Sequence, residues 1–446
     1  MSDDDIDLLV VGGGMAGLTA AARAASRGAS VVVVESSGAV GGSGLFAGFL
    51  WSAPTHAVMD EINPDGDPAL RARLVDDFGA ATDWLRELEV PFADAVTVLR
   101  YGRGHRFDTA QYIAACERTV KEHGELLVRT TVTELLEASG AVVGAVVATD
   151  GGPRTVRARR TLLATGGFQA DPALRAELLH PQARDVELRS NPESAGGGLR
   201  LAQGVGADTG PTGAGFYGHL VPSGVALTDT SLFVDLALYY SEHALLFNLA
   251  GERFVDETVG DHLTTMALLE QPEARGLLVG DARVFRDWIT GSYVEGTVGL
   301  DKFALAQRRG ARCAIAESID EFADVPEEWG YDGERIRQVL HEVNAGADVV
   351  PGRRYDSTPL TEPPYYVVEA RPAVTFPFTG IRIDRYCRVL RPDGEPIPGL
   401  LAAGADTGGV YVRAYAGGIA QAMVFGLAAA DAVAHPLRRA EQPLCP

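Results

Sequence analysis

The chain has few of the residues that several kinds of chemistry require. Its lysines are Lys121 and Lys302 alone, so catalysis through a Schiff base has two candidates at most. The four cysteines are far apart, form no CxxC pair and indicate neither a disulfide framework nor a zinc site, so we expect no metal. No apolar run reaches the roughly 18 residues of a membrane span, and we expect no membrane association.

Basic residues are outnumbered by acidic ones, 39 to 60, which leaves a formal net charge of −21 over 446 residues. A nucleic-acid-binding protein needs Lys and Arg to displace phosphate counterions, so this balance argues against such a partner. An anionic small molecule stays possible, because a pocket can oppose the sign of the whole chain. The N-terminus is acidic where a secretory signal is basic, so we expect a cytoplasmic protein. Apolar residues reach 46%, enough for the cores of two or three domains.

A GxGxxG pattern follows the apolar run at residues 6–11, and an alanine-rich helical segment and a second apolar run at 31–34 come after it. This order is typical of a dinucleotide-binding unit, whose glycines let the chain turn tightly and approach a pyrophosphate. The helix N-terminus offers unpaired N–H groups to the phosphates, and the acid that ends the second run can bind a ribose. The residues of this expected cofactor site are Gly12, Gly14, Met15, Ala16, Gly17 and Glu35.

A second glycine-rich loop at residues 36–44 comes directly after that acid. Nicotinamide enzymes do not usually need a loop here, whereas the pyrophosphate and ribityl chain of FAD continue past the first loop. The pattern therefore favours FAD, with Ser36, Gly41, Gly42 and Ser43 as further cofactor contacts. No histidine that could link the flavin stands in residues 42–50, so we expect the FAD to be non-covalent.

With these loops the sequence resembles the flavoprotein family of succinate dehydrogenase and fumarate reductase, which also holds 3-ketosteroid dehydrogenases and tricarballylate dehydrogenase. The resemblance extends over residues 6–430. It is carried by the Gly12–Gly17 loop with Glu35, Gly41-Gly42-Ser43, Ala164-Thr165-Gly166-Gly167-Phe168, Gly251–Glu257, Gly399–Gly404 and the C-terminal Gly417-Gly418 with Phe425-Gly426.

The resemblance implies an α/β fold, with a Rossmann-like FAD-binding domain of the GR2 type and an inserted α+β capping domain. We expect the FAD-binding domain at residues 1–212 and 356–446 and the capping domain at 213–355. The further cofactor contacts that the resemblance implies are Val132, Thr165, Gly166, Gly404, Asp406, Gly418 and Ile419. No second GxGxxG unit follows, so the electron donor or acceptor stays unidentified.

The activity that the resemblance implies is hydride transfer through flavin N5 and proton transfer at the neighbouring carbon, which forms or reduces a C=C bond beside a carboxylate or ketone. Such an enzyme needs a group that polarises the carbonyl, an acid or base, and a cap that excludes water. The alternatives are a ketosteroid-type dehydrogenase of cyclic ketones, a flavin oxidase of amines or alcohols, and a flavin-holding protein without turnover.

The candidate carbonyl contacts lie in the strip before the C-terminal glycine pair. Arg413 is the first choice as carboxylate anchor, because a guanidinium binds a carboxylate with two hydrogen bonds. Tyr415 is its rival, since the ketosteroid dehydrogenases have a ketone-polarising tyrosine at this place. Tyr411 and Phe376 are expected substrate contacts. Thr375 and Phe376 stand where fumarate reductases have a carboxylate-binding histidine, which argues against a two-carboxylate clamp.

The candidate proton-transfer residues lie in the expected cap. His219 and Tyr217 stand at its start, where the family often has substrate contacts. Arg283 is a candidate counterpart of the acid arginine of fumarate reductases. Arg253 and Glu257 match a family pattern but lack its neighbouring arginine, so we expect this pair to hold the cap together.

Overall fold

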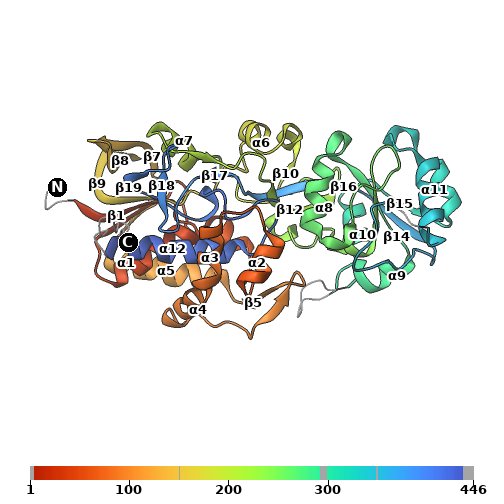
Figure 1. Cartoon of the computed structure of the whole chain (residues 1–446), viewed down its shortest axis with the longest axis horizontal. Coiled ribbons are helices and arrows are strands. Elements are labelled where there is room, and N and C mark those ends of the chain that lie inside the picture. The colour runs from red at the N-terminus through yellow and green to blue at the C-terminus, as the bar shows by residue number, and fades with distance from the viewer. Residues whose placement is uncertain (1–4, 150, 292–298, 348–349, 435–446) are drawn as a thin grey trace, which may run out of the picture. The chain divides into compact units, whose positions relative to one another are not determined.

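The computed structural model describes residues 5–149, 151–291, 299–347 and 350–434, and it divides into two compact units (Figure 1). Unit 1 comprises Met1–Leu174, Ser190–Gly215 and Phe376–Pro446. Unit 2 comprises Arg175–Arg189 and Phe216–Thr375. Each unit is therefore built from segments that are far apart in the sequence. Within the described ranges, no helix is both long and apolar enough to cross a membrane.

Unit 1 is organised around an eight-stranded sheet in which the first apolar run, β1, occupies a central place. Its strands are β1 (Ile6–Val11), β2 (Val31–Val34), β6 (Glu125–Leu127), β7 (Thr131–Ala138), β8 (Ala141–Thr149), β9 (Gly152–Leu163), β18 (Arg388–Leu390) and β19 (Pro396–Ala402). The order β18-β19-β9-β1-β2-β6 is parallel except for β18. β1 pairs on both edges, Leu8 with Val31 of β2 and with Arg160 of β9. Leu8, Leu9, Val10 and Val11 of β1 are buried, as a central parallel strand requires.

Helices pack on this sheet through small residues. α1 (Met15–Ser26) contacts both α5 (Thr109–His123) and α12 (Gly418–Ala434), and the three helices lie together beneath the sheet in Figure 1. Ala20, Ala21 and Ala22 of α1 are fully buried, and their short side chains let the neighbouring backbones come close. α12 is apolar on nearly all sides, which fits a helix enclosed by protein.

Shorter elements complete unit 1. They are β3 (Phe49–Ser52), β4 (Val96–Val98) and β5 (Gly102–Arg106), which form a small sheet, with α2 (His56–Ile62), α3 (Pro68–Asp76), α4 (Phe78–Glu87), α7 (Gly197–Gly204), β11 (Thr209–Gly210) and β17 (Gly380–Ile381). β7 and β8 form an antiparallel meander with β9, whose twelve residues also reach the parallel sheet. α6 (Pro172–Leu178) carries the chain across the first boundary between the units.

Unit 2 is built on a six-stranded, mostly antiparallel sheet around the long strand β16. Its strands are β10 (Glu187–Leu188), β12 (Phe216–Pro222), β13 (Leu245–Phe247), β14 (Gly276–Gly280), β15 (Cys313–Ala316) and β16 (Tyr365–Pro377). Its helices are α8 (Asp261–Leu269), α9 (Ala282–Val284), α10 (Lys302–Arg308) and α11 (Gly333–Asn344). A buried cluster that includes Leu245, Phe247, Leu278 and Ile336 forms its core. The expected α/β fold with a Rossmann-like sheet is confirmed, and unit 2 mixes helices and strands.

Candidate active site and cofactor cradle

The loop between β1 and α1 has the backbone geometry that the glycine spacing predicts. Gly12 has φ +105°, and a Cβ there would lie 2.3 Å from the carbonyl oxygen of Ala164. A Cβ at Gly17 would lie 2.0 Å from the carbonyl oxygen of Gly12, so helix and strand meet too closely for a side chain. At Gly14 a Cβ would meet no atom within 4 Å, and no side chain caps the helix that begins there. An open space therefore faces the N-terminus of α1, as a bound phosphate requires.

Glu35 joins the first two glycine loops. Its carboxylate accepts hydrogen bonds from the backbone N–H of Gly13 at 2.8 Å and from the backbone N–H of Ser37 at 2.8 Å. The Gly13 carbonyl in turn accepts the N–H of Gly41 at 2.8 Å. The acid expected to bind a ribose therefore also fixes the loops beside the cofactor space.

The second loop turns through two glycines with positive φ. Gly41 has φ +119° and Gly42 has φ +51°, and a Cβ at Gly42 would lie 3.7 Å from Cα of Gly14. The hydroxyl of Ser43 pairs with that of Ser190 at 2.9 Å, which holds the loop to another segment of unit 1. Ser36 follows Glu35 in the exposed part of the turn, and Val132 is buried in β7.

Asp406 clamps a third loop. It is 2% exposed, and Oδ1 accepts the N–H of Gly167 at 2.8 Å and the hydroxyl of Thr165 at 3.0 Å, while Oδ2 accepts the N–H of Thr165. Burial raises the pKa of this carboxyl, and the hydrogen bonds from the loop oppose that shift. A Cβ at Gly198 would lie 2.7 Å from both Asp406 and Thr165, so the clamp requires a glycine there.

The start of α12 is capped by a phenol. The N–H of Gly418 donates to the hydroxyl oxygen of Tyr415 at 2.9 Å, and the hydroxyl of Tyr411 donates to the Gly417 carbonyl at 3.0 Å. Tyr101 donates to the Tyr415 carbonyl at 2.6 Å. These contacts fix the tyrosine ring against the helix end, where the partial positive charge of the helix is concentrated.

Aromatic rings surround Tyr415 on several sides. Its ring centroid lies 5.2 Å from Trp51, 5.7 Å from Tyr411 and 5.9 Å from Phe376. Tyr411 is 1% exposed, whereas Phe376 and the helix residues Gly418 and Ile419 are partly exposed. The structure thus brings Tyr415, Tyr411 and Phe376 together within unit 1.

Arg413 precedes this cluster in a strained turn. Its φ is +53°, a conformation that costs a residue with a side chain about 1 kcal/mol or more. The turn is held by the Arg413 N–H, which donates to the Ala214 carbonyl at 2.7 Å, and the side chain is exposed. Strain of this kind clusters at functional sites, and here it falls on an arginine five residues before the start of α12.

In unit 2, His219 of β12 is hydrogen-bonded to the first residue of α8. Its Nδ1 lies 2.5 Å from Oδ2 of Asp261, and both side chains are 5% exposed. The other oxygen of Asp261 accepts the N–H of Leu220 at 3.2 Å. The carboxylate therefore receives Nδ1–H and leaves Nε2 as the second reactive position of the ring.

Burial sets the charge of this pair. It lowers the pKa of His219 well below its usual value, and the nearby Arg189 guanidinium lowers it further. Burial also raises the pKa of Asp261 to about 7, against the hydrogen bond from Leu220. The adjacent His262 has its pKa lowered to about 4 by burial. Burial therefore disfavours the charged form of both His219 and Asp261.

Aromatic and cationic side chains flank the pair. The rings of Tyr217 and Tyr239 contact the His219 ring edge-to-face at 4.9 and 5.0 Å. Arg189 reaches Tyr239 with a contact of 3.4 Å between Nη2 and the phenol oxygen. His219 and Tyr217 were predicted from the sequence. Asp261, Tyr239 and Arg189 were missed, because each lies far from His219 in the chain and belongs to no motif of fixed spacing. One signal was present: an Asp-His pair at the start of a helical pattern at 261.

Arg283 lies elsewhere in unit 2, on α9. Its Nε and Nη2 atoms are buried and find no hydrogen-bond partner in the part of the chain that the structure describes. Arg253 and Glu257 form a buried ion pair at 2.6 Å, and Glu257 also accepts the N–H of Leu246. That pair is fully engaged in holding the unit together.

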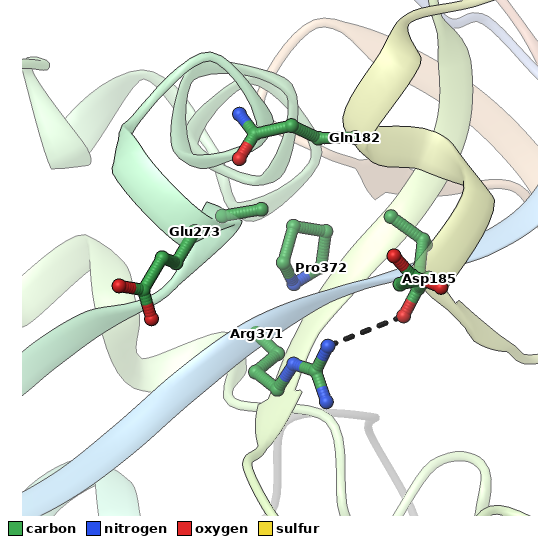
Figure 2. Close-up of a pocket in the computed structure, with 7 residues that line it drawn as sticks. Gln182, Asp185, Glu273, Arg371 and Pro372 are labelled. Carbon is green, nitrogen blue, oxygen red and sulfur yellow. Dashed lines mark hydrogen bonds between the residues drawn. The ribbon is translucent and has the colours of Figure 1, made fainter. Parts of the chain in front are cut away.

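A surface hollow of about 260 Å³ in unit 2 contains none of the candidate residues (Figure 2). It is lined by Gln182, Asp185, Val186, Glu273, Ala274, Arg371 and Pro372. Gln182 donates to the carbonyls of Leu269 and Gln271, and Arg371 donates to the Asp185 carbonyl. Glu273 pairs with the side chain of Arg275 at 2.8 Å, so polar groups of this hollow are engaged within the protein. No cluster of three or more metal-binding side chains occurs within the described ranges.

The three glycine loops, the open end of α1 and the Rossmann-like sheet define a dinucleotide-binding flavoprotein. The chain belongs to the FAD binding domain family, whose model matches residues 7–419, and FAD is its cofactor. It is similar to the fumarate reductase (cytochrome) of Shewanella frigidimarina, at 26% identity over 97% of this chain and 77% of that protein. It is 27% identical to the urocanate reductase of Eggerthella lenta over 91% and 70%.

Solved structures share the fold. The 3-ketosteroid-Δ4-(5α)-dehydrogenase from Rhodococcus jostii RHA1 superimposes with a TM-score of 0.77 at 20% identity, covering 98% of both chains. The resemblance to the fumarate reductase and ketosteroid dehydrogenase flavoproteins is thereby confirmed. The chain is an FAD-dependent oxidoreductase.

Proposed function

We propose that this chain forms or reduces a C=C bond beside the carboxylate or ketone of a small to medium organic metabolite. Similarity to reductases named for fumarate and urocanate, both unsaturated acids, supports this reaction class. The observation that carries the proposal is the Tyr415 phenol, held by the Gly418 N–H at the end of α12 in the FAD-binding unit. Bound FAD would supply the hydride chemistry, and the residues of the chain supply orientation and proton handling.

Tyr415 is suited to polarise a carbonyl. The Gly418 N–H occupies one lone pair of its oxygen, so the phenolic proton is directed to another acceptor. The helix end stabilises negative charge that develops on that oxygen as the proton is shared. Arg413 is the proposed carboxylate anchor beside it, since its guanidinium is always charged and binds a carboxylate with two hydrogen bonds.

His219 is the proposed proton partner. Asp261 accepts the proton on Nδ1, so Nε2 can take or give a proton at the substrate carbon. Arg283 is the alternative, because its buried Nε and Nη2 have donors to offer. We further propose that unit 2, near the expected range 213–355, acts as the cap and that FAD is held without a covalent bond. We also propose that the protein is cytoplasmic and exchanges electrons with an unidentified donor or acceptor.

Anaerobic bleaching of the bound flavin tests this function. Saturated monocarboxylates, tricarboxylates, cyclic ketones and 3-ketosteroids are offered to the wild type and to Arg413→Ala. Bleaching by acids that is lost in Arg413→Ala supports an acid dehydrogenase with that anchor. Bleaching by ketones that survives in Arg413→Ala moves the role to Tyr415 and supports the cyclic-ketone alternative.

The reverse direction is tested on the same protein. Flavin reduced beforehand is mixed with the unsaturated partners, and reoxidation by them identifies a reductase. If no panel member bleaches the flavin and none reoxidises it, the proposed reaction class is wrong. Bleaching by amines or alcohols with rapid reoxidation by oxygen would instead identify an oxidase.

A further inference from the structure

Arg189 is a buried arginine directly after β10 that has an unusual set of partners. It is 8% exposed, and its Nε donates to the Phe233 carbonyl at 2.9 Å. The guanidinium also lies over the Phe233 ring, 5.5 Å from its centroid. These two contacts fix the plane of the guanidinium and leave its two terminal amino groups to be satisfied by others.

The terminal amino groups have only weak, neutral partners. Nη1 lies 3.3 Å from the hydroxyl of Thr375, and Nη2 lies 3.4 Å from the hydroxyl of Tyr239. Both distances are at the long end for a hydrogen bond. In the described part of the chain no carboxylate comes within 4.0 Å of Arg189. A guanidinium has five N–H donors, so at least two are unused here.

Other arginines of unit 2 have carboxylate or backbone-carbonyl acceptors for their terminal amino groups. Arg253 is bound by both oxygens of Glu257, Arg275 donates to the buried Glu369 at 2.9 Å, and Arg175 donates to the carbonyls of Val186 and Arg184. A buried cation costs several kcal/mol in general, and the terminal amino groups of Arg189 have only two long hydroxyl contacts, so an anion that joins them would lower this cost. Arg189 thus has the donors, the charge and the fixed plane of a carboxylate-binding site.

The surroundings of Arg189 are partly open and chemically mixed. Tyr217, Tyr239 and Thr375 each keep some exposed surface, so the cluster reaches the outside of unit 2. His219 and Asp261 are hydrogen-bonded to each other, and burial disfavours the charged form of each. Two acids act electrostatically on Tyr239, namely Asp261 of this pair and Asp235. An anion at Arg189 would therefore have these two carboxyl groups and several polar or aromatic side chains in its neighbourhood.

We propose that Arg189 binds the carboxylate of an organic-acid ligand within unit 2, with Thr375 and Tyr239 completing the hydrogen bonds. The identity of this ligand as the substrate rests on the proposed function. With Arg413 as a second cation, the chain then has two arginines for acids, one in each unit. The ligand class is a mono- or dicarboxylate with an apolar or aromatic body that contacts Tyr217 and Tyr239.

The test measures binding to the FAD-loaded protein without requiring turnover. Propanoate, succinate, 3-phenylpropanoate and, as a neutral probe, cyclohexanone are titrated against the wild type, Arg189→Gln and Arg189→Lys. Thermal shift and the change in the visible flavin spectrum report binding. Arg175→Gln is the matched control, since Arg175 is also buried but donates to the carbonyls of Val186 and Arg184.

We expect Arg189→Gln to raise the dissociation constant of at least one carboxylate by about tenfold to a hundredfold, the size of a charge-assisted contact. Arg189→Lys should retain part of the affinity, and cyclohexanone and the control Arg175→Gln should show no such change. The inference is overturned if no carboxylate binds the wild type. It is also overturned if Arg189→Gln binds acids normally, or if acids and cyclohexanone weaken equally. Arg189-dependent binding with neither bleaching of the oxidised flavin nor reoxidation of the reduced flavin would sink the proposed function and leave this site standing.

Discussion

Nδ1 of His219 on β12 lies 2.5 Å from Oδ2 of Asp261 on α8, although 42 sequence positions separate the two residues. The carboxylate selects which ring nitrogen carries the proton and holds the ring plane. It thereby makes Asp261 a positioning residue for the proposed proton transfer. The role of Asp261 can be tested directly, because a second His–Asp pair, His243 with Asp356, serves as the control.

Asp261→Asn should lower the rate of flavin reduction on the order of a hundredfold, the size of a general acid–base contribution. The amide can donate to Nδ1 and so favours the wrong tautomer. Proton NMR should show the Nδ1–H signal of the wild type disappear in the variant. Asp356→Asn is the control, since Asp356 pairs with His243 at 2.6 Å, and it should leave the rate near the wild-type value. Equal rates in both variants would remove Asp261 from the mechanism.

Stability should fall in acid, chiefly because of His262. Burial lowers the pKa of His262 from 6.5 to about 4, so its contribution to stability is present above pH 6.5 and is lost as pH falls through 4. This shift amounts to about 3 kcal/mol in the free energy of unfolding. The lowered pKa of His219 destabilises the fold as pH falls, whereas the raised pKa of Asp261 stabilises it, so the two effects oppose each other. Urea unfolding of the wild type and His262→Gln at pH 6.5 and 4.5 checks this, and a parallel loss in both would refute it.

Gly14→Ala and Gly12→Ala should separate cofactor binding from folding. A Cβ at Gly14 meets no atom and its φ is −82°, so the apo fold should change by less than about 0.5 kcal/mol. The same methyl enters the space before α1, so FAD affinity should fall at least about tenfold. Gly12→Ala should instead prevent correct folding, because its Cβ would lie 2.3 Å from a backbone oxygen. Urea unfolding of apoprotein and FAD fluorescence titration measure the two effects, and tight FAD binding by Gly14→Ala would contradict the cradle.

Asp406→Asn should loosen the third cofactor loop. Its amide nitrogen cannot accept the N–H that one carboxylate oxygen accepts now, so a buried donor at Thr165 or Gly167 loses its partner. We expect a loss of about 2 kcal/mol in the free energy of unfolding and faster FAD release on dilution. Asp393→Asn, in an exposed turn, is the control for removal of a negative charge. Unchanged FAD release in Asp406→Asn would show that the clamp serves the fold alone.

Tyr415→Phe should separate the helix cap from the chemistry. Losing the acceptor for the Gly418 N–H should cost about 1 kcal/mol of stability. Because the phenol would no longer donate a hydrogen bond to the substrate carbonyl, flavin reduction by ketones should slow on the order of a hundredfold. Tyr112→Phe removes another buried phenol, which pairs with Thr19 at 2.7 Å, and should affect stability only. Stopped-flow reduction of both variants decides, and a full rate in Tyr415→Phe would exclude the phenol from the reaction.

The cofactor cradle was largely predictable from sequence, because its geometry is local. At Gly12 and Gly17 another part of the backbone comes too close for a side chain to fit, either a few residues away or on the neighbouring strand. Glycines required in this way recur at a fixed spacing in the sequence.

The polar cluster of unit 2 could not be predicted in the same way. Arg189 meets Thr375 across 186 positions, and Asp261 meets His219 across 42, so only the tertiary fold brings them together. A single arginine after a two-residue strand belongs to no periodic pattern from which its role could be predicted. The sequence position of Thr375 indicated a lost histidine but not the guanidinium that lies against it. The roles of Arg413, Tyr415, His219 and Arg283 stay predictions.

The clamp between Asp406 and Thr165 has a consequence for how the chain is made. The loop at 165–167 leaves the ribosome long before the residue that secures it, since 241 positions separate the two. β19, which lies beside β9 in the sheet, and α12, which packs on α1, also come from the last segment of the chain. We therefore expect a growing chain to retain FAD only after the segment that carries Asp406, β19 and α12 has been made. Products truncated before that segment should stay colourless.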